Sequence, residues 1–453
     1  MTEKISILLL IDLIMTVVAV YFGLTLRFGA FPHAYDFLGL GAARVLIFGG
    51  VLIFSSFLAE LYDNEKNNLK KEVFVRVLTA TLISFFVLST LYYLIPTVMI
   101  GRAVLAMSLA LFAVFQLSWH ISHQIVMKFP RFARRVLILG TGPLANQMGC
   151  IISSMHHNYV LTGYVNCTNE AVFVPQNSII GSGNGLMETA QREKAHKIVV
   201  SLSERRGTFP LKDVLSCKLG GIEVMDAPSF YEQMTGKLLI ENITPSWFIF
   251  SDGFKITHSK MFVKRAVDVA LSLTGLLICL PLIPLIALAV KLDSPGPVFL
   301  RQSRMGQREK NFVLYKFRTM RQDAEASTGA VWSQKDDPRV TRIGKFLRKS
   351  RLDEIPQLFN VLKGDMSIVG PRPERPEFIE NLKEVIPFYS ERHFVKPGIT
   401  GWAQIKYPYG SSVEDSLEKL RYDLFYIKNL TFSLDLLIML ETSKVILFGK
   451  GGR

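Results

Sequence analysis

Two adjacent carboxylates, Asp353 and Glu354, carry the clearest chemical signal in this 453-residue chain. A run of basic residues, 342–351, precedes them, and a Gly-Pro-Arg-Pro turn that carries the guanidinium of Arg372 follows. Like charges side by side split their proton affinities, so one carboxyl can be ionised as a nucleophile while its neighbour holds or takes a proton. Cationic side chains can hold phosphate oxygens as charge develops on them. The combination suits phosphoryl chemistry, although an Asp-Glu pair alone is also typical of an ordinary helix start.

A second pair of cations lies upstream, in the stretch 312–320, Phe-Val-Leu-Tyr-Lys-Phe-Arg-Thr-Met. Its alternation of apolar and polar residues is typical of a β-strand and puts Lys316 and Arg318 on one face. We therefore expect both cations to point at one place and to bind phosphate. From residue 301 to 351, basic residues far outnumber acidic ones. Such a surface attracts lipid phosphates and a sugar-nucleotide pyrophosphate alike, and a general lipid-binding face would explain many of these charges.

The bulk composition indicates a membrane protein. Hydrophobic residues make up 49% of the chain and the mean hydropathy is +0.28, too apolar for a soluble protein of this size. The net charge of +14 favours anionic lipids and phosphate-bearing substrates as partners, and no nucleic-acid-binding module is recognisable. The four scattered cysteines form no CxxC pair, which argues against zinc and disulfides and fits a reducing, cytoplasmic location. The length predicts two or three structural units.

Four apolar segments fill the first quarter, at residues 5–26, 42–61, 77–95 and 103–121. Each approaches the ~20 residues that a transmembrane helix needs, so we predict a four-helix transmembrane bundle over residues 1–127. Asp12 lies inside the first segment and is expected to face the bundle interior or an interface, with a functional role as the alternative. The loops after the second and fourth segments are the basic ones, with Lys66 and Arg76 in the former and Lys128 and Arg131 in the latter. The positive-inside rule therefore places both ends of the bundle in the cytoplasm.

A Rossmann-like domain is predicted for residues 128–255. An apolar run from Arg135 leads into Gly-Thr-Gly-Pro-Leu-Ala, a GxGxxA turn, and further strands are expected at 161–166, 197–202 and 222–225. The acidic residue that binds a ribose in dinucleotide-binding domains is missing, and Asn166 stands at the end of the second strand. Nucleotide binding therefore stays open beside a structural or regulatory role for this domain.

A fifth apolar stretch, 262–292, opens the last predicted domain, 256–453. Pro281 and Pro284 lie at its centre, where they interrupt backbone hydrogen bonding. Basic residues flank it on both sides, so a crossing would put one basic flank outside the cell, against the positive-inside rule. We predict a re-entrant helix that enters the cytoplasmic leaflet, bends at the prolines and returns. The alternative is a transmembrane helix with a proline kink.

Several long motifs of the last domain resemble those of one family. They are Lys-Phe-Arg-Thr-Met at 316–320, the stretch 352–373 around the acidic pair, Lys-Pro-Gly-Ile-Thr-Gly-Trp-Ala-Gln at 396–404 and Tyr-Asp at 422–423. In these the chain is similar to the bacterial sugar transferases that act as monotopic polyprenyl-phosphate phosphoglycosyl transferases. The three-part layout is similar to the large members that initiate exopolysaccharide, capsule or O-antigen synthesis, and the linker 245–254 resembles that of exopolysaccharide-locus enzymes. The resemblance thus implies an α/β membrane protein with a mixed α/β catalytic domain.

The resemblance also implies a reaction and roles for single residues. A hexose-1-phosphate would pass from a UDP-sugar to undecaprenyl phosphate at the cytoplasmic face of the bacterial inner membrane, with release of UMP. Asp353 would attack the β-phosphate to form a covalent intermediate, and Glu354 would be its acid/base partner. The phosphates and a Mg²⁺ ion would involve Lys316, Arg318, Arg372 and Asp423, with Asp353 and Glu354 as metal ligands. Leu280 stands where smaller members often carry Ser, so the helix break would depend on Pro281 and Pro284.

Two other interpretations remain at this stage. The chain could be a non-catalytic membrane scaffold or ligand sensor of polysaccharide assembly, or a polytopic transferase whose fifth segment crosses the membrane. Membrane lipids are expected partners, and the bundle and middle domain could support a homodimer. The sequence does not identify the sugar: glucose or galactose is expected from the resemblance, with N-acetylated sugars as alternatives.

Overall fold

The computed structural model describes residues 2–29, 40–59, 61–62, 70–128, 133–154, 159–167, 171–183, 185–202, 209–243, 248, 251, 253–322, 324, 337–407, 410 and 412–448. Lys66, Arg131 and most of the predicted linker 245–254 lie outside this part of the chain. The chain divides into two compact units, Met1–Ala227 and Pro228–Arg453.

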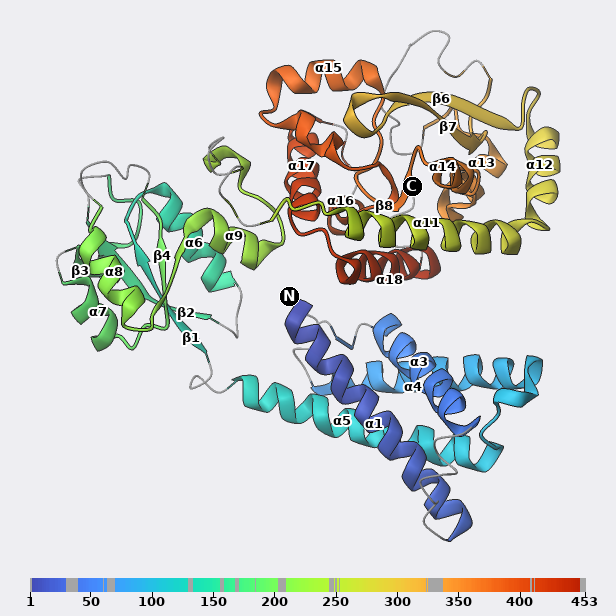
Figure 1. The fold of residues 1–453 in the computed structure, drawn as a ribbon, viewed down its shortest axis with the longest axis horizontal. Coiled ribbons are helices and arrows are strands. Elements are labelled where there is room, and N and C mark those ends of the chain that lie inside the picture. Colours follow the sequence, from blue (N-terminus) through green and yellow to red (C-terminus); the bar gives the residue numbers. More distant parts are fainter. Residues whose placement is uncertain are drawn as a thin grey trace. The chain divides into compact units, whose positions relative to one another are not determined.

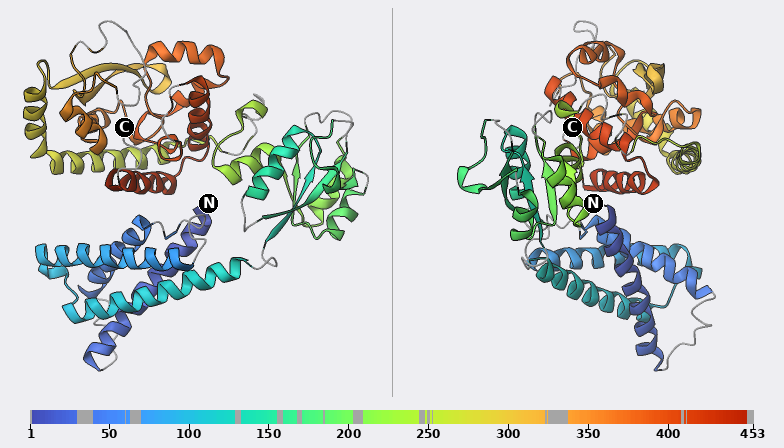
Figure 2. Two further views of the ribbon diagram at one scale, coloured as in Figure 1. Left: turned by 180° about the vertical axis from the view of Figure 1, so that it is seen from behind. Right: turned by 60° about the vertical axis from the view of Figure 1, so that its left-hand side comes forward.

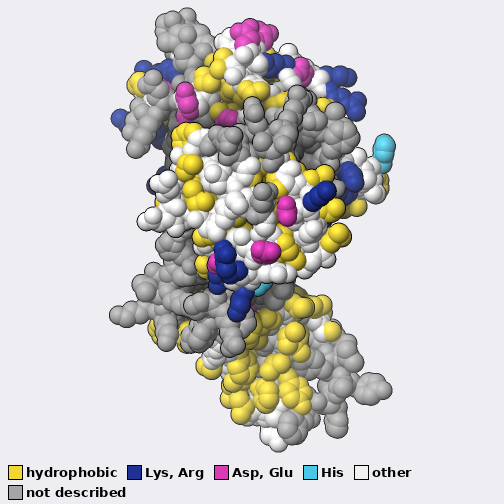
Figure 3. Space-filling model, turned by 90° about the vertical axis from the view of Figure 1, so that its left-hand side faces the viewer, with side chains coloured by type: hydrophobic (Ala, Val, Ile, Leu, Met, Phe, Trp, Pro, Cys, Tyr) yellow, Lys and Arg dark blue, Asp and Glu magenta, His cyan; other side chains and the backbone are white. Residues whose placement is uncertain are grey.

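The first unit begins with four long apolar helices, as predicted. They are α1 (Thr2–Phe28), α3 (Leu40–Leu58), α4 (Lys70–Leu94) and α5 (Arg102–Lys128). Each contains an apolar window of 18 to 22 residues, long enough to cross a bilayer. Phe48, Leu88 and Phe112 are buried between the helices. Hydrophobic side chains also cover the outside of the bundle, shown in yellow in the lower part of Figure 3, as expected for a surface that faces lipid.

Asp12 faces the interior of this bundle, in agreement with the prediction. Its carboxylate is fully buried and accepts hydrogen bonds from the Tyr62 hydroxyl at 2.5 Å and from Gln116 Nε2 at 2.7 Å. Gln116 Nε2 also donates to Ser56 Oγ at 2.9 Å. These bonds join α1, α3 and α5 because unpaired polar groups are costly in an apolar environment.

The second part of the first unit is a parallel five-stranded sheet with the order β3-β2-β1-β4-β5. Its strands are β1 (Arg134–Leu139), β2 (Tyr159–Asn166), β3 (Ile179–Ser182), β4 (Lys197–Val200) and β5 (Glu223–Asp226). Helices α7 (Leu186–Arg192) and α8 (Leu211–Leu219) cover one face, and α6 (Pro143–Ser154) covers the other (Figures 1 and 2). This doubly wound arrangement confirms the predicted Rossmann-like topology.

The second unit is a mixed α/β domain framed by helices. An antiparallel pair, β6 (Phe299–Met305) and β7 (Asn311–Phe317), and a short parallel pair, β8 (Ser367–Val369) and β9 (Gly398–Thr400), form its two small sheets. Besides the helix pair at its start, its described helices are α9 (Ala227–Thr235), α13 (Arg342–Ser350), α14 (Gln357–Lys363), α15 (Pro376–Val385), α16 (Trp402–Lys406), α17 (Val413–Lys428) and α18 (Phe432–Phe448). Trp402, Leu424 and Tyr426 lie in its main core.

The apolar stretch at the start of this domain is broken at the predicted place. α11 (His258–Cys279) and α12 (Leu282–Asp293) meet at Pro281 with a bend of 64°. Pro284 lies in the first turn of α12, where its missing N–H leaves no bond unmade. The break itself is therefore due to Pro281, and Pro284 belongs to the start of the second helix.

Candidate active site

The acidic pair lies on a single 3₁₀ turn between two helices. α13 ends at Ser350 and is followed by Arg351, which adopts the left-handed conformation with φ of 59°. The 3₁₀ turn Leu352–Glu354 follows, and α14 begins directly after Pro356. Neither acidic side chain caps this turn or the next helix, so the pair is not an ordinary helix start. A non-glycine residue in the left-handed conformation costs about 1–2 kcal/mol, and strain of this kind concentrates at functional sites.

Glu354 is surrounded by cations. Its Oε1 atom lies 2.9 Å from Arg372 Nη2, 3.3 Å from Lys316 Nζ and 3.6 Å from Arg351 Nη1. Asp353 and Glu354 are 6% and 8% exposed, so these charges interact largely shielded from water. The structure therefore brings together four of the predicted site residues, namely the acidic pair, Lys316 and Arg372.

The pKa values of the two carboxyls are split, as expected for such a pair. Burial raises the pKa of Asp353, and the charge of Glu354 adds to this effect against the attraction of Lys316. Burial also opposes ionisation of Glu354, but Lys316 and Arg372 hold the pKa of Glu354 well below its ordinary value. Glu354 is thus the more acidic member of the pair. The resemblance assigns the attacking carboxylate to Asp353, the less acidic member, and only its ionised form can attack.

Two arginines hold the turn that carries Arg372. Arg392 Nη2 donates to the carbonyl oxygen of Arg372 at 3.0 Å, and Arg304 Nη1 donates to that of Pro373 at 3.1 Å. The turn also packs against β9 at glycine positions, because a Cβ atom on Gly398 would lie 2.1 Å from the backbone nitrogen of Gly370. These contacts fix the backbone from which the guanidinium of Arg372 reaches Glu354.

Asp423 binds Arg392, the arginine that holds the Arg372 carbonyl. It is 2% exposed, and its Oδ2 atom accepts a bond from Arg392 Nη2 at 2.7 Å. Burial raises the pKa of Asp423 to about 6 even though Arg392 favours its charged form. The same arginine donates to the Tyr389 hydroxyl at 2.7 Å. Asp423 was predicted near phosphate or metal, and its direct partner in the structure is Arg392.

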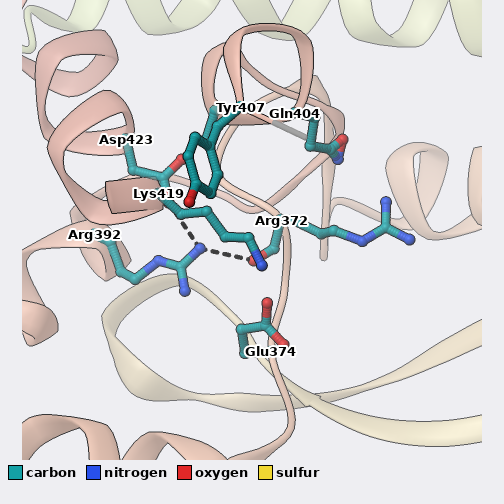
Figure 4. A pocket seen from close by; sticks show the side chains of 8 residues that line it. Arg372, Glu374, Arg392, Gln404, Tyr407, Lys419 and Asp423 are labelled. Atoms are coloured by element: carbon teal, nitrogen blue, oxygen red, sulfur yellow. Dashed lines mark hydrogen bonds and ion pairs between the residues drawn. The ribbon is translucent and has the colours of Figure 1, made fainter. Parts of the chain in front are cut away.

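A pocket lies in front of these residues (Figure 4). It is lined by Arg372 and Glu374 from the turn after β8, by Gln404 from α16, by Tyr407, and by Lys419 and Asp423 from α17. Figure 4 shows the carboxylate of Glu374 and the ammonium of Lys419 pointing toward each other. Burial lowers the pKa of Lys419, against the attraction of Glu374. The pocket therefore adjoins the acidic pair through Arg372.

The expectation for Arg318 is wrong. β7 ends at Phe317, so the strand alternation that would align Arg318 with Lys316 stops one residue too early. Arg318 is 5% exposed, and its guanidinium donates to the carbonyl oxygens of Ser294 at 2.6 Å and Pro295 at 2.9 Å. It thus binds the carbonyl groups that follow α12, as cationic side chains do at helix ends, and does not reach the acidic pair.

The acidic pair is suited to hold Mg²⁺ together with a substrate. Mg²⁺ is commonly bound by one or two carboxylates plus phosphate oxygens of the substrate. Asp353 Oδ1 is buried and accepts no hydrogen bond from the described residues, so an oxygen ligand is available. No cluster of three or more His, Cys, Asp or Glu side chains occurs in the described part of the chain. The described residues therefore do not supply a complete set of protein ligands for a metal ion. The acidic pair fits a site in which substrate phosphate oxygens supply the other ligands.

The sequence reasoning missed Arg392, Glu374 and Lys419. Glu374 lies two residues after Arg372, directly after the Gly-Pro-Arg-Pro turn, whereas Arg392 and Lys419 come close to Arg372 only through folding. One signal was available: Lys419 and Asp423 are four residues apart, which puts them on one face of a predicted helix. Arg351 was noticed as part of the basic run, but its left-handed backbone could not be.

Comparison with known proteins identifies the family to which the second unit is similar. Residues 259–449 match the family model "Bacterial sugar transferase". Exopolysaccharide production protein PSS of Rhizobium leguminosarum bv. phaseoli is 41% identical over 187 residues, which cover 40% of this chain and 94% of the relative. The chain belongs to the bacterial sugar transferase family.

Two longer relatives have more specific names. UDP-N-acetylgalactosamine-undecaprenyl-phosphate N-acetylgalactosaminephosphotransferase of Aeromonas hydrophila is 41% identical over 237 residues, 52% of this chain and 55% of the relative. Undecaprenyl-phosphate glucose phosphotransferase of Komagataeibacter xylinus is 35% identical over 332 residues, 71% of this chain and 60% of the relative. The chain thus spans somewhat more than half the length of these two proteins.

Proposed function

We propose that this protein transfers a hexose-1-phosphate from a UDP-sugar to undecaprenyl phosphate at the cytoplasmic face of the bacterial inner membrane. The reaction would initiate exopolysaccharide, capsule or O-antigen synthesis. The observation that carries the proposal is the buried acidic pair with Lys316 and Arg372 bound to Glu354. The names of the relatives, which include phosphotransferases for glucose and for N-acetylgalactosamine, support the substrate class.

The proposed chemistry proceeds in two displacements at phosphorus. A carboxylate oxygen of Asp353 attacks the β-phosphorus of the donor, the bond from that phosphorus to the bridging oxygen breaks, and UMP leaves with the electron pair. The aspartyl phosphosugar is then attacked by a phosphate oxygen of undecaprenyl phosphate, which returns the electron pair to Asp353. Splitting the transfer in this way means that the two anionic substrates need not be bound together.

The cations around Glu354 are suited to stabilise the negative charge of the donor's phosphate groups during the transfer. Arg372 and Lys316 lie within reach of the phosphate oxygens of a donor placed at Asp353, where they can stabilise the charge that develops during the transfer. Mg²⁺, when held by Asp353 and Glu354 together with the donor, would neutralise part of the pyrophosphate charge. Lys316 and Arg372 lower the pKa of Glu354 and so keep this carboxylate ionised beside Asp353; its acid/base role is what the family resemblance implies.

The contacts of α11 and α12 support a re-entrant arrangement. Near the start of α11, Arg265 donates to the carbonyl oxygens of Val361 and Leu362 at 2.5 and 2.7 Å. At the end of α12, Asp293 accepts a bond from the Ile343 backbone N–H at 2.9 Å. Both arms are therefore fastened to the same globular domain, and in this proposal that domain lies on the cytoplasmic side of the membrane. A helix pair with both ends on one side enters the bilayer and returns.

The apolar side chains of this pair supply the membrane contact. Around the bend, Leu277, Ile278, Leu280 and Leu285 are 72%, 67%, 62% and 63% exposed. An exposed apolar patch of this kind is typical of a surface that inserts into lipid. The site would thus be held at the interface, where a lipid-linked phosphate is within reach.

Replacement of the proposed nucleophile tests the function. Asp353→Asn is nearly isosteric, and we expect it to reduce UMP release from UDP-sugars in membranes by at least ~10³-fold, as for other nucleophile removals. Glu380→Gln, on the exposed side of α15, is the matched carboxylate-to-amide control and should keep normal turnover. Near-normal turnover of Asp353→Asn would refute the assigned role. A panel of UDP-sugars in the same assay identifies the donor.

A further inference from the structure

The pocket beside the acidic pair contains polar groups that the proposed chemistry leaves unused. Arg372 both lines this pocket and donates to Glu354 at 2.9 Å. Arg392 and Asp423 neutralise each other at 2.7 Å, and the Tyr407 hydroxyl donates to Asp415 Oδ1 at 2.8 Å. The pocket groups with remaining hydrogen-bonding capacity are therefore those of Glu374, Lys419 and Gln404.

Glu374 and Lys419 keep most of their capacity. Arg304 Nη1 lies 3.9 Å from Glu374 Oε2, too far for a hydrogen bond. Lys419 Nζ donates to the carbonyl oxygen of Gly410 at 2.8 Å. An ammonium has three N–H donors, so two remain after this bond as far as the described residues show. A carboxylate and an ammonium that point toward each other across a cavity can bind a hydroxyl group as acceptor and donor at once (Figure 4).

The size and charge of the pocket favour one part of the donor. The cavity measures about 30 Å³, room for roughly two water-sized groups, which suits the hydroxyl-bearing edge of a sugar ring better than a whole uracil. The carboxylate of Glu374 disfavours a second phosphate. The aromatic ring of Trp402 is not available for stacking on a base, because it is 3% exposed and stacks on Phe425 in the core.

We propose that this pocket receives the hydroxyl-bearing edge of the donor's sugar ring, and that Glu374 and Lys419 select the hydroxyl group there. The inference rests on the proposed function, because it takes the β-phosphate of the donor to lie at Asp353, close to Arg372, which also lines the pocket. A site built to hydrogen-bond a hydroxyl discriminates strongly against an analogue without it, since its buried polar groups are then left unpaired. Glu374 and Lys419 are therefore specificity-determining residues.

The test combines enzyme variants with donor analogues. With the UDP-sugar that the wild-type protein uses best, and its four monodeoxy analogues at ring positions 2, 3, 4 and 6, kcat/KM is measured by UMP release. For the wild type we expect one analogue to be slower by about 10–100-fold, the loss of one hydrogen bond to a charged group. In Glu374→Gln and Lys419→Met, kcat/KM for the complete UDP-sugar should fall by a similar factor. The ratio of kcat/KM between the complete UDP-sugar and that deoxy analogue should then be about threefold or less. Glu380→Gln should retain the wild-type pattern.

Other results would overturn the subsite. If both variants keep the full penalty for the same analogue, the hydroxyl binds elsewhere. If they weaken inhibition by UMP and leave the deoxy penalties unchanged, the pocket holds the uridine. Failure of the wild type to release UMP from any UDP-sugar would instead contradict the proposed function, so the two failures are distinguishable. Unchanged KM for undecaprenyl phosphate in both variants is also expected.

Discussion

Replacing Glu354 by glutamine should destabilise the second unit because it leaves partly buried cations without their buried counterion. Glu354 Oε1 lies 2.9 Å from Arg372 and 3.3 Å from Lys316. At an effective dielectric constant of about 20, the Coulomb attraction at these distances is about 5 kcal/mol for each pair. Desolvation offsets much of this, and the amide keeps a carbonyl acceptor. We therefore expect a net loss near the lower limit for breaking a buried ion pair, about 3 kcal/mol.

This loss has a measurable size and a second signature. For a unit of this length, about 3 kcal/mol corresponds to a decrease in Tm of roughly 6–12 °C. Inorganic phosphate should raise the Tm of Glu354→Gln more than that of the wild type, because it can replace the missing charge among the cations. Differential scanning calorimetry of the purified full chain in detergent measures both effects, with Glu380→Gln as control. A Tm within a degree of the wild type, without a phosphate response, would refute the electrostatic reasoning.

Three further outcomes are expected. The rate of UMP release should fall as the pH drops through the raised pKa of Asp353, because a protonated nucleophile does not attack. Glu354→Gln should move this acid limb to lower pH, and a pH–rate profile that does not move would count against the coupling. Arg392→Lys removes the bond that holds the Arg372 carbonyl and should raise the KM for the UDP-sugar about 10-fold. The KM for undecaprenyl phosphate should stay unchanged. Equal changes in both KM values would argue for a general loss of folding. Cysteines introduced at positions 258 and 292, on either side of the Pro281 bend, should both be labelled only from the cytoplasm, and periplasmic labelling of either would exclude the re-entrant arrangement.

Much of the architecture could be predicted because its signals are local. The four membrane helices follow from segments that approach the thickness of a bilayer. The parallel sheet follows from buried apolar strands separated by helical segments. The strand β3, at Ile179–Ser182, was missed because only its first two residues are apolar and a glycine and a serine follow them. The bend at Pro281 was predictable because proline removes a backbone donor, but only the structure shows that Pro284 starts the next helix.

The site was predictable only where one strand or one motif contains the residues. Lys316 and the acidic pair were found in this way. Arg318 was not, since the strand ends at Phe317 and its guanidinium turns to the carbonyl groups after α12. The positions of Arg392 and Lys419 depend on tertiary packing, which no sequence spacing encodes. Which of the two carboxyls has the lower pKa also depends on folding, because the three cations around Glu354 come from different elements.

The most direct measurement is whether Asp353 becomes covalently loaded. The purified full chain is incubated with UDP-sugar labelled in the β-phosphate and the sugar, without undecaprenyl phosphate, and then denatured and digested. We expect label on the peptide that contains Asp353, release of this label on addition of undecaprenyl phosphate, and no label in Asp353→Asn. Catalytically active protein that transfers sugar phosphate to the lipid without ever carrying label at Asp353 would contradict it.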